Sequence, residues 1–227
     1  MLEEFGPSLY LADGPTISFL GFPYPTRMAV VRLCDGSAWV WSPIPLSAEL
    51  ERAVAAIGAV RHIVSPNKIH HLFLAEWAER WPDARLYAPP GLARRRRDLS
   101  FDATLGNAPD PAWAAELDQV IFHGSFALEE VVFFHRPSRA VIMGDLVQRH
   151  DPAQAKGLKG LIMRLDGLVG DEGSTPRDFR ATFWRRAPAR EARARVLAWN
   201  PERLVVAHGS CVRNDAQPVI ARALAWL

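Results

Sequence analysis

The chain has 227 residues, of which 49% are hydrophobic and 23% are charged, and its formal net charge is +2. This length and composition exclude a disordered chain and fit a single domain, residues 1–227, with a sizeable buried core. The nearly balanced charge neither favours nor opposes an anionic partner. The two cysteines, Cys34 and Cys211, are far apart in sequence, which excludes a disulfide framework and is compatible with a reducing cytoplasm.

The first ten residues include Glu3 and Glu4 and no long apolar run, so we expect no signal peptide. No run of about 18 apolar residues occurs, and we therefore expect no membrane span. These two absences lead us to expect a soluble cytoplasmic protein.

Apolar periodicity and turn residues predict the elements of the first part of the chain. In chain order they are a short strand at 9–11, a turn at 13–15, a hairpin over 28–41, a helix over 47–57, a strand over 60–64, a helix over 70–81 and a strand over 85–88. Ser47, with Glu49 and Glu51 behind it, marks the start of the first helix.

The second part begins with residues 92–113, which are rich in loop-forming residues. We then expect strands over 131–135 and 140–143, a poorly structured stretch over 148–175, helices over 179–186 and 190–199, a strand over 204–207 and a closing helix over 218–227. This order of elements fits two mixed sheets packed together with helices outside them.

The most specific pattern lies between residues 60 and 88. A strand leads into Ser65-Pro66-Asn67-Lys68-Ile69-His70-His71, followed by an amphipathic helix and the strand-forming run Arg85-Leu86-Tyr87. The arrangement resembles the central motif of the metallo-β-lactamase superfamily, in which a strand ends in Thr-His-x-His-x-Asp-His before a helix and a second strand. Ser65 stands at the threonine, Pro66 and Lys68 at the first two histidines, His70 at the aspartate and His71 at the last histidine.

Two later runs carry the same resemblance. Residues 140–145 resemble the superfamily strand that ends in Gly-Asp, and residues 204–209 resemble the late strand that ends in a metal-binding histidine. The Pro-Asn-Lys-x-His-His form, with residues 24–28 and 133–138, is similar to the DUF4336-type proteins. The resemblance implies an α/β fold, a four-layer αββα sandwich of the metallo-β-lactamase kind.

The resemblance also implies a reduced metal site. One metal of the superfamily is held by the first two motif histidines and a third histidine, whose place falls near Phe126 in this chain. Because Pro66 has no ligand atom and Lys68 is a cation, we expect that metal position to be empty. The ligands of the second metal correspond to His70, His71, Asp145 and His208. Three imidazoles and one carboxylate suit zinc, and iron or manganese less selectively.

Other residues gain expected roles from the same comparison. Lys68 is expected to replace the missing cation and pair with Asp145, and Lys68 and Asn67 to stabilise developing negative charge during catalysis. Glu130 and His135 are expected to contact the metal-binding residues and orient them, without binding the metal themselves. His123 and Cys211 are further candidates to join the site.

Each of these residues also has a purely structural explanation. Adjacent residues of a regular helix point about 100° apart, so His70 and His71 can bind one ion only in a loop or first turn, and the pair can equally cap a helix. Asp145 can be a turn residue, and His208 a histidine whose hydrogen bonds are satisfied by backbone at a strand end.

Three functions follow, in order of preference. The first is a single-metal hydrolase acting on a small ester, thioester, lactone or phosphoester. The second is a non-catalytic or metal-free protein that binds a small ligand in the same place. The third is a nucleic-acid-binding protein or nuclease, suggested by the arginines of 94–97 and 177–195, although such runs more often form solvated helix faces. The tryptophans would permit a dimer interface without indicating one.

Overall fold

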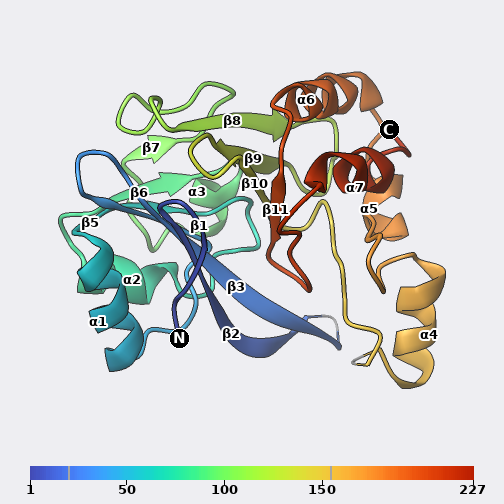
Figure 1. Cartoon of the computed structure of the whole chain (residues 1–227), viewed down its shortest axis with the longest axis horizontal. Coiled ribbons are helices and arrows are strands. Elements are labelled where there is room, and N and C mark those ends of the chain that lie inside the picture. The colour runs from blue at the N-terminus through green and yellow to red at the C-terminus, as the bar shows by residue number, and fades with distance from the viewer. Residues whose placement is uncertain (20, 154) are drawn as a thin grey trace.

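Two β-sheets pack face to face in the computed structural model, and helices cover the outer side of each sheet (Figure 1). The structure describes residues 1–19, 21–153 and 155–227. The expected fold, two mixed sheets with helices outside, is confirmed.

The first sheet is mixed and has the strand order β1-β2-β3-β4-β5-β6-β7. Its strands are β1 (Glu3–Gly6), β2 (Leu9–Phe19), β3 (Phe22–Arg32), β4 (Ala38–Trp41), β5 (Val60–Val64), β6 (Arg85–Ala88) and β7 (Ala103–Thr104). Pairing is antiparallel from β1 to β4 and parallel from β4 to β7. The parallel half places the carboxyl ends of its strands at one edge of the sheet.

The second sheet has the order β11-β10-β9-β8. Its strands are β8 (Leu117–Phe122), β9 (Glu130–His135), β10 (Ala140–Met143) and β11 (Arg203–Val206). β10 runs antiparallel to β9 and parallel to β11. β10 and β11 therefore end at the same edge.

Alternating side chains on the strands build the layers. On β4, Trp39 and Trp41 enter the core between the sheets, whereas Val40 packs in a second core with helix residues such as Val54 and Trp77. β9 alternates similarly: Phe133 faces the inter-sheet core, and its neighbours on either side face a third core against the C-terminal helices. These three cores separate four layers.

The helices are α1 (Ala48–Ile57), α2 (Leu74–Arg80), α3 (Leu92–Arg95), α4 (Gly157–Leu165), α5 (Arg177–Ala181), α6 (Arg186–Ala198) and α7 (Ala216–Ala223). α1 begins where the sequence predicts, since the Ser47 hydroxyl accepts the Leu50 N–H at 3.1 Å. Among the described residues, none of these helices is long and apolar enough to cross a membrane.

Several elements differ from the sequence prediction. The expected turn at 13–15 is an irregularity inside the long strand β2, where the register shifts between Asp13 and Thr16. β8 was not among the expected strands. α4 lies within the stretch of 148–175 that was expected to be poorly structured, and large apolar side chains of this helix are exposed, for example Leu158 at 74%. Helix α2 begins at Leu74 instead of His70.

The late start of α2 has a local cause. The Asn67 side-chain oxygen accepts N–H groups from Ile69 and His70, and the Ser65 hydroxyl lies 2.8 Å from the carbonyls of Asn67 and His70. Such side-chain contacts give the backbone an alternative to helical hydrogen bonds. Residues 65–70 consequently form a tight turn, and His70 lies in that turn.

Candidate metal centre

Strand register brings together two of the predicted ligands. Met143 pairs with Val206 at the ends of the parallel strands β10 and β11. Asp145 and His208 each follow two residues later, so they leave the same sheet edge side by side. His70 arrives from the other sheet, on the turn after β5.

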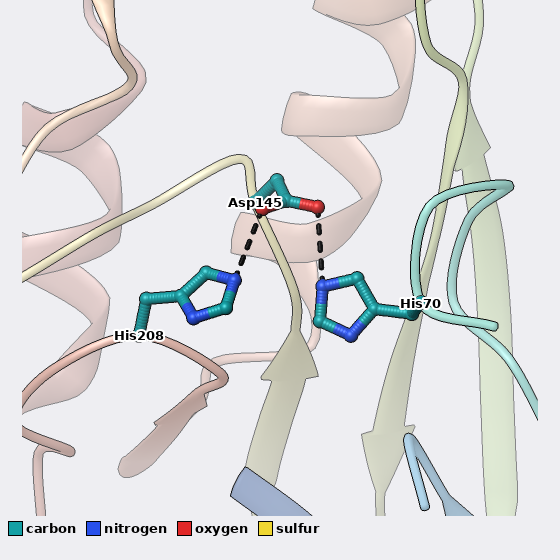
Figure 2. A group of neighbouring side chains, drawn as sticks. All are labelled: His70, Asp145 and His208. Atoms are coloured by element: carbon teal, nitrogen blue, oxygen red, sulfur yellow. Dashed lines mark ion pairs between the residues drawn. The ribbon is translucent and has the colours of Figure 1, made fainter. Parts of the chain in front are cut away.

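The three side chains form one compact group. His70 Nε2 lies 3.2 Å from Asp145 Oδ2, and His208 Nε2 lies 3.2 Å from Asp145 Oδ1. Figure 2 shows the two imidazoles approaching different oxygens of the carboxylate. All three residues offer ligand atoms within 4.8 Å of one another, and Asp145 and His208 are buried.

Each imidazole is oriented by a hydrogen-bond partner at its Nδ1 atom, on the side of the ring away from Asp145. The Nδ1 atom of His208 lies 2.7 Å from the carbonyl oxygen of Pro25, which can only accept a hydrogen bond, so Nδ1 carries a proton. His70 Nδ1 lies 2.8 Å from the hydroxyl of Ser42, which can donate or accept. A partner on the distal ring nitrogen is the usual arrangement around a metal-ligating histidine.

The orientation of His208 requires a positive charge between its Nε2 atom and the Asp145 carboxylate. With its proton on Nδ1, a neutral ring would direct the Nε2 lone pair at the Asp145 carboxylate, which is unfavourable. Burial lowers the pKa of His208, but the hydrogen bond and the charge of Asp145 outweigh burial and raise it. Either a proton on Nε2 or a metal ion can provide the positive charge.

A buried carboxylate and an amide hold Asp145. The Asn67 amide donates to Asp145 Oδ2 at 2.7 Å and to Glu130 Oε2 at 3.1 Å. Glu130 also accepts the backbone N–H groups of Gly144 and Asp145. Burial raises the pKa of Asp145, but the charge of His70 and hydrogen bonds from both imidazoles more than offset it, so the net pKa is lowered. Asp145 is therefore ionised and fixed in place.

Comparison with known proteins places the chain in a family. The family model described as "Domain of unknown function (DUF4336)" matches residues 17–159, more than half of the chain. The chain belongs to the DUF4336 family. A search of curated proteins found no matching relative.

Solved structures similar to this DUF4336 protein include metallo-β-lactamases. One from Pontibacter korlensis has 14% identity and a TM-score of 0.66, covering 100% of this chain and 97% of its own. A DIM-1 metallo-β-lactamase exposed to ceftazidime has 15% identity and a TM-score of 0.66, with 100% and 95% covered. One from Hirschia baltica has 11% identity and a TM-score of 0.64, with 100% and 96% covered. The metallo-β-lactamase fold is confirmed.

His71, the fourth predicted ligand, does not join the group. Its Nδ1 lies 3.2 Å from Arg96 Nη1, and the same guanidinium nitrogen donates to the His71 carbonyl at 2.7 Å. Burial and the charges of Arg95 and Arg96 lower the pKa of His71. Consecutive side chains in this turn diverge, so His70 faces Asp145 while His71 faces the end of α3.

Lys68 and Asn67 differ from their expected roles. Among the described residues, no ion pair joins Lys68 to Asp145; the lysine side chain runs beside Gly91, where a Cβ atom would lie 3.6 Å from Lys68 Cδ. Asn67 lies against Asp145 instead, and both N–H groups of its amide are used by Asp145 and Glu130. Asn67 is thus a positioning residue with no donor left for a substrate.

Glu130 and His135 divide the expected supporting role unequally. Glu130 lies behind the group, but its partners are backbone N–H groups and Asn67, not a histidine. His135 is at the other end of β9, about 17 Å along the strand, where its Nδ1 is 2.7 Å from the Ser138 hydroxyl. The expectation for His135 is therefore corrected.

The other candidates also lie outside the group. His123 pairs with Glu129 at 2.9 Å, and Cys211 Sγ lies 3.1 Å from Arg27 Nη1. Pro66 packs next to Gly144, and Phe126, near the place of the third superfamily histidine, is exposed at 69%. Within the described part of the chain, His70, Asp145 and His208 are the one set of metal-ligand residues this close together.

Sequence reasoning missed Ser42, Pro25 and Arg27. Arg27 Nη1 donates to the carbonyl oxygens of Val206 and Gly209, on both sides of His208. Its signal was present, since Arg27 lies in the 24–28 stretch that is similar to DUF4336-type proteins. Pro25 lies in the same stretch, whereas the hydroxyl of Ser42 gave no signal, because only the folded chain brings it to the His70 imidazole.

Proposed function

We propose that this protein is a metal-dependent hydrolase with a single divalent cation held by His70, Asp145 and His208. The observation that carries the proposal is the orientation of His208, whose Nε2 is directed at Asp145 by the Pro25 carbonyl. Two imidazoles and one carboxylate suit zinc, with iron and manganese also compatible, and three protein ligands leave a coordination position open, as in catalytic zinc sites.

A cation bound there supplies Lewis-acid chemistry, polarising a carbonyl or phosphoryl oxygen and making water more acidic. The protein's own residues prepare this chemistry. Ser42 and the Pro25 carbonyl fix the imidazole rings, and Asn67 and Glu130 fix Asp145. The proposed substrates are small esters, thioesters, lactones or phosphoesters.

A metal-free ligand-binding protein is the second candidate. It is favoured by one observation: each oxygen of Asp145 already lies 3.2 Å from an imidazole, so a protonated His208 would satisfy the group without a metal. The nucleic-acid hypothesis ranks last because many of the arginines that suggested it make contacts within the protein. Arg195 pairs with Asp118, and Arg193 donates to the carbonyl of Ala221.

Metal content tests the proposal directly. Protein purified without chelator should contain about one equivalent of metal by elemental analysis. Asp145→Asn and His208→Ala should lose it, whereas His71→Ala, which removes the neighbouring histidine outside the group, should keep it. Loss of metal in His71→Ala would restore the four-ligand assignment, and two equivalents in the wild type would contradict a single-metal site.

Activity is tested next, on a panel of esters, thioesters, lactones and phosphoesters. Turnover should stop with EDTA and return with added zinc or manganese. A wild type that takes up no zinc, manganese or iron would instead support the metal-free candidate. Metal binding without turnover of any class would count against the hydrolase assignment.

A further inference from the structure

The candidate metal centre lines a cavity with walls that are largely apolar. The cavity has a volume of about 610 Å³, within the range of small-molecule sites. Asp145 and His208 belong to its lining and are buried, so they lie on its inner side. Large apolar side chains from several segments line it as well: Ile17 from β2, Ile69 and Leu72 around the His70 turn, Leu128 before β9, and Phe179 from α5.

The cavity mouth is apolar too. Leu72 lines the cavity and yet is 53% exposed, so part of this side chain faces solvent. Phe126, adjacent to the lining residue Ala127, packs edge-on against Trp184 at 5.7 Å, and the two are exposed at 69% and 83%. Exposed apolar side chains beside a cavity favour a binding site for an apolar ligand.

The two exposed charged groups of the lining have opposite signs and together give no preference for a charged ligand. Arg95 and Asp178 both line the cavity and both are exposed, so their opposite charges lie on its outer side. A polar ligand body placed against the apolar walls would lose hydration without gaining partners. The walls therefore suit an apolar body, and the buried end suits one polar group.

We propose that the substrate is an ester or thioester of a hydrophobic acyl group. The scissile carbonyl lies at His70, Asp145 and His208, and the acyl chain lies along Ile69, Leu72 and Phe179. In the reaction, water adds to the carbonyl carbon and the C–O or C–S bond breaks. The carboxylic acid and the alcohol or thiol are released, with the proton from water on the leaving group. The reaction step rests on the proposed hydrolase function; the apolar binding site does not.

Burial of each methylene group against the walls should tighten binding about three- to fourfold. Neutral, non-hydrolysable probes test this without turnover: the N-methylamides of butyric, hexanoic, octanoic and decanoic acid. Calorimetric titration of the protein as purified, at probe concentrations below micelle formation, should give dissociation constants that fall steadily with chain length. Dissociation constants independent of chain length would overturn the proposal.

A matched pair of variants locates the site. Leu72→Gln should weaken binding of the octanoic amide about fivefold or more and change that of the butyric amide little. Leu158→Gln alters a side chain that is 74% exposed on α4 and does not belong to the cavity lining, so it should change neither. Equal effects of the two variants would contradict the assignment to this cavity.

Kinetics separate this inference from the proposed function. The kcat/KM for p-nitrophenyl esters should rise from acetate to octanoate, and Leu72→Gln should flatten that rise. Metal-dependent turnover of acetyl esters or phosphoesters without a chain-length preference would overturn the acyl-binding inference and leave the hydrolase function standing. Chain-length-dependent binding in a protein that holds no metal would support the apolar site and count against the hydrolase.

Discussion

Glu130 accepts a hydrogen bond from the backbone N–H of Asp145 at 2.6 Å, so one buried carboxylate anchors the residue that carries another. Its second oxygen accepts the Gly144 N–H at 2.8 Å. Burial, followed by the charge of Asp145, raises the pKa of Glu130. The Asn67 amide lies between the two carboxylates and donates to both, which reduces their repulsion.

The first prediction concerns this anchor. In Glu130→Gln, one carboxylate oxygen is replaced by an NH2 group. In either orientation of the amide, this NH2 group faces the backbone N–H of Gly144 or Asp145, so two buried donors meet without an acceptor. This should lower the free energy of unfolding by about 2–3 kcal/mol at pH 8. Metal content should fall as well, because Asp145 is no longer fixed. Urea denaturation and elemental analysis measure the two effects.

Glu129→Gln is the matched control. Glu129 is partly exposed and pairs with His123, so this change should cost less than about 1 kcal/mol. If the two variants prove equally stable, Glu130 does not anchor the Asp145 backbone.

Gly209 provides the second prediction. Its φ is +102°, and a Cβ atom there would lie 2.1 Å from the Arg149 carbonyl oxygen. Gly209→Ala should therefore destabilise the protein by about 3 kcal/mol or more and displace the adjacent His208, with loss of metal.

Gly36→Ala separates steric overlap from backbone strain. Gly36 also has a positive φ, +84°, but a Cβ atom there would meet no heavy atom within 4 Å. This control should lose only about 1 kcal/mol and keep its metal. Similar losses in both alanine variants would show that the contact with Arg149 relaxes easily. Thermal unfolding compares them.

The sequence predicted what depends on local periodicity. Apolar runs and a turn predicted the hairpin over 28–41, and the structure pairs β3 with β4 and places Trp39 and Trp41 in one core and Val40 in another. The resemblance to the superfamily motifs predicted Asp145 and His208 at strand ends, and the structure brings both residues to one sheet edge because β10 and β11 are parallel neighbours. The first result follows from local sequence patterns, and the second from the motif resemblance.

The sequence did not predict features that depend on distant partners. The difference between His70 and His71 depends on Arg96, which follows α3 and has its Nη1 atom 3.2 Å from Nδ1 of His71. The role of Asn67 depends on Glu130, which is 63 residues away in sequence. No local pattern contains such a partner, so the sequence left all four ligand candidates equivalent.

The last prediction concerns His135, which is fully buried on β9 far from the candidate metal centre. Burial lowers its pKa from 6.5 to about 4, outweighing the opposite effect of Glu116. The unfolded chain therefore binds a proton between these values that the folded chain excludes. Stability from this residue is present above pH 6.5 and is lost as the pH falls toward 4.

Between pH 7.5 and pH 5, His135 should lower the free energy of unfolding by about 2 kcal/mol. The pKa of the buried His150 is also lowered to about 4, so this residue lowers the free energy of unfolding in the same direction. His135→Asn places an amide near the Ser138 hydroxyl and removes the protonation of His135. Between pH 7.5 and pH 5, its free energy of unfolding, measured by urea denaturation at several pH values, should fall by about 2 kcal/mol less than that of the wild type. The comparison uses slopes, so a uniform loss of packing in the variant does not affect it. Parallel slopes would mean that His135 is protonated in the folded protein, and burial would then not control its pKa.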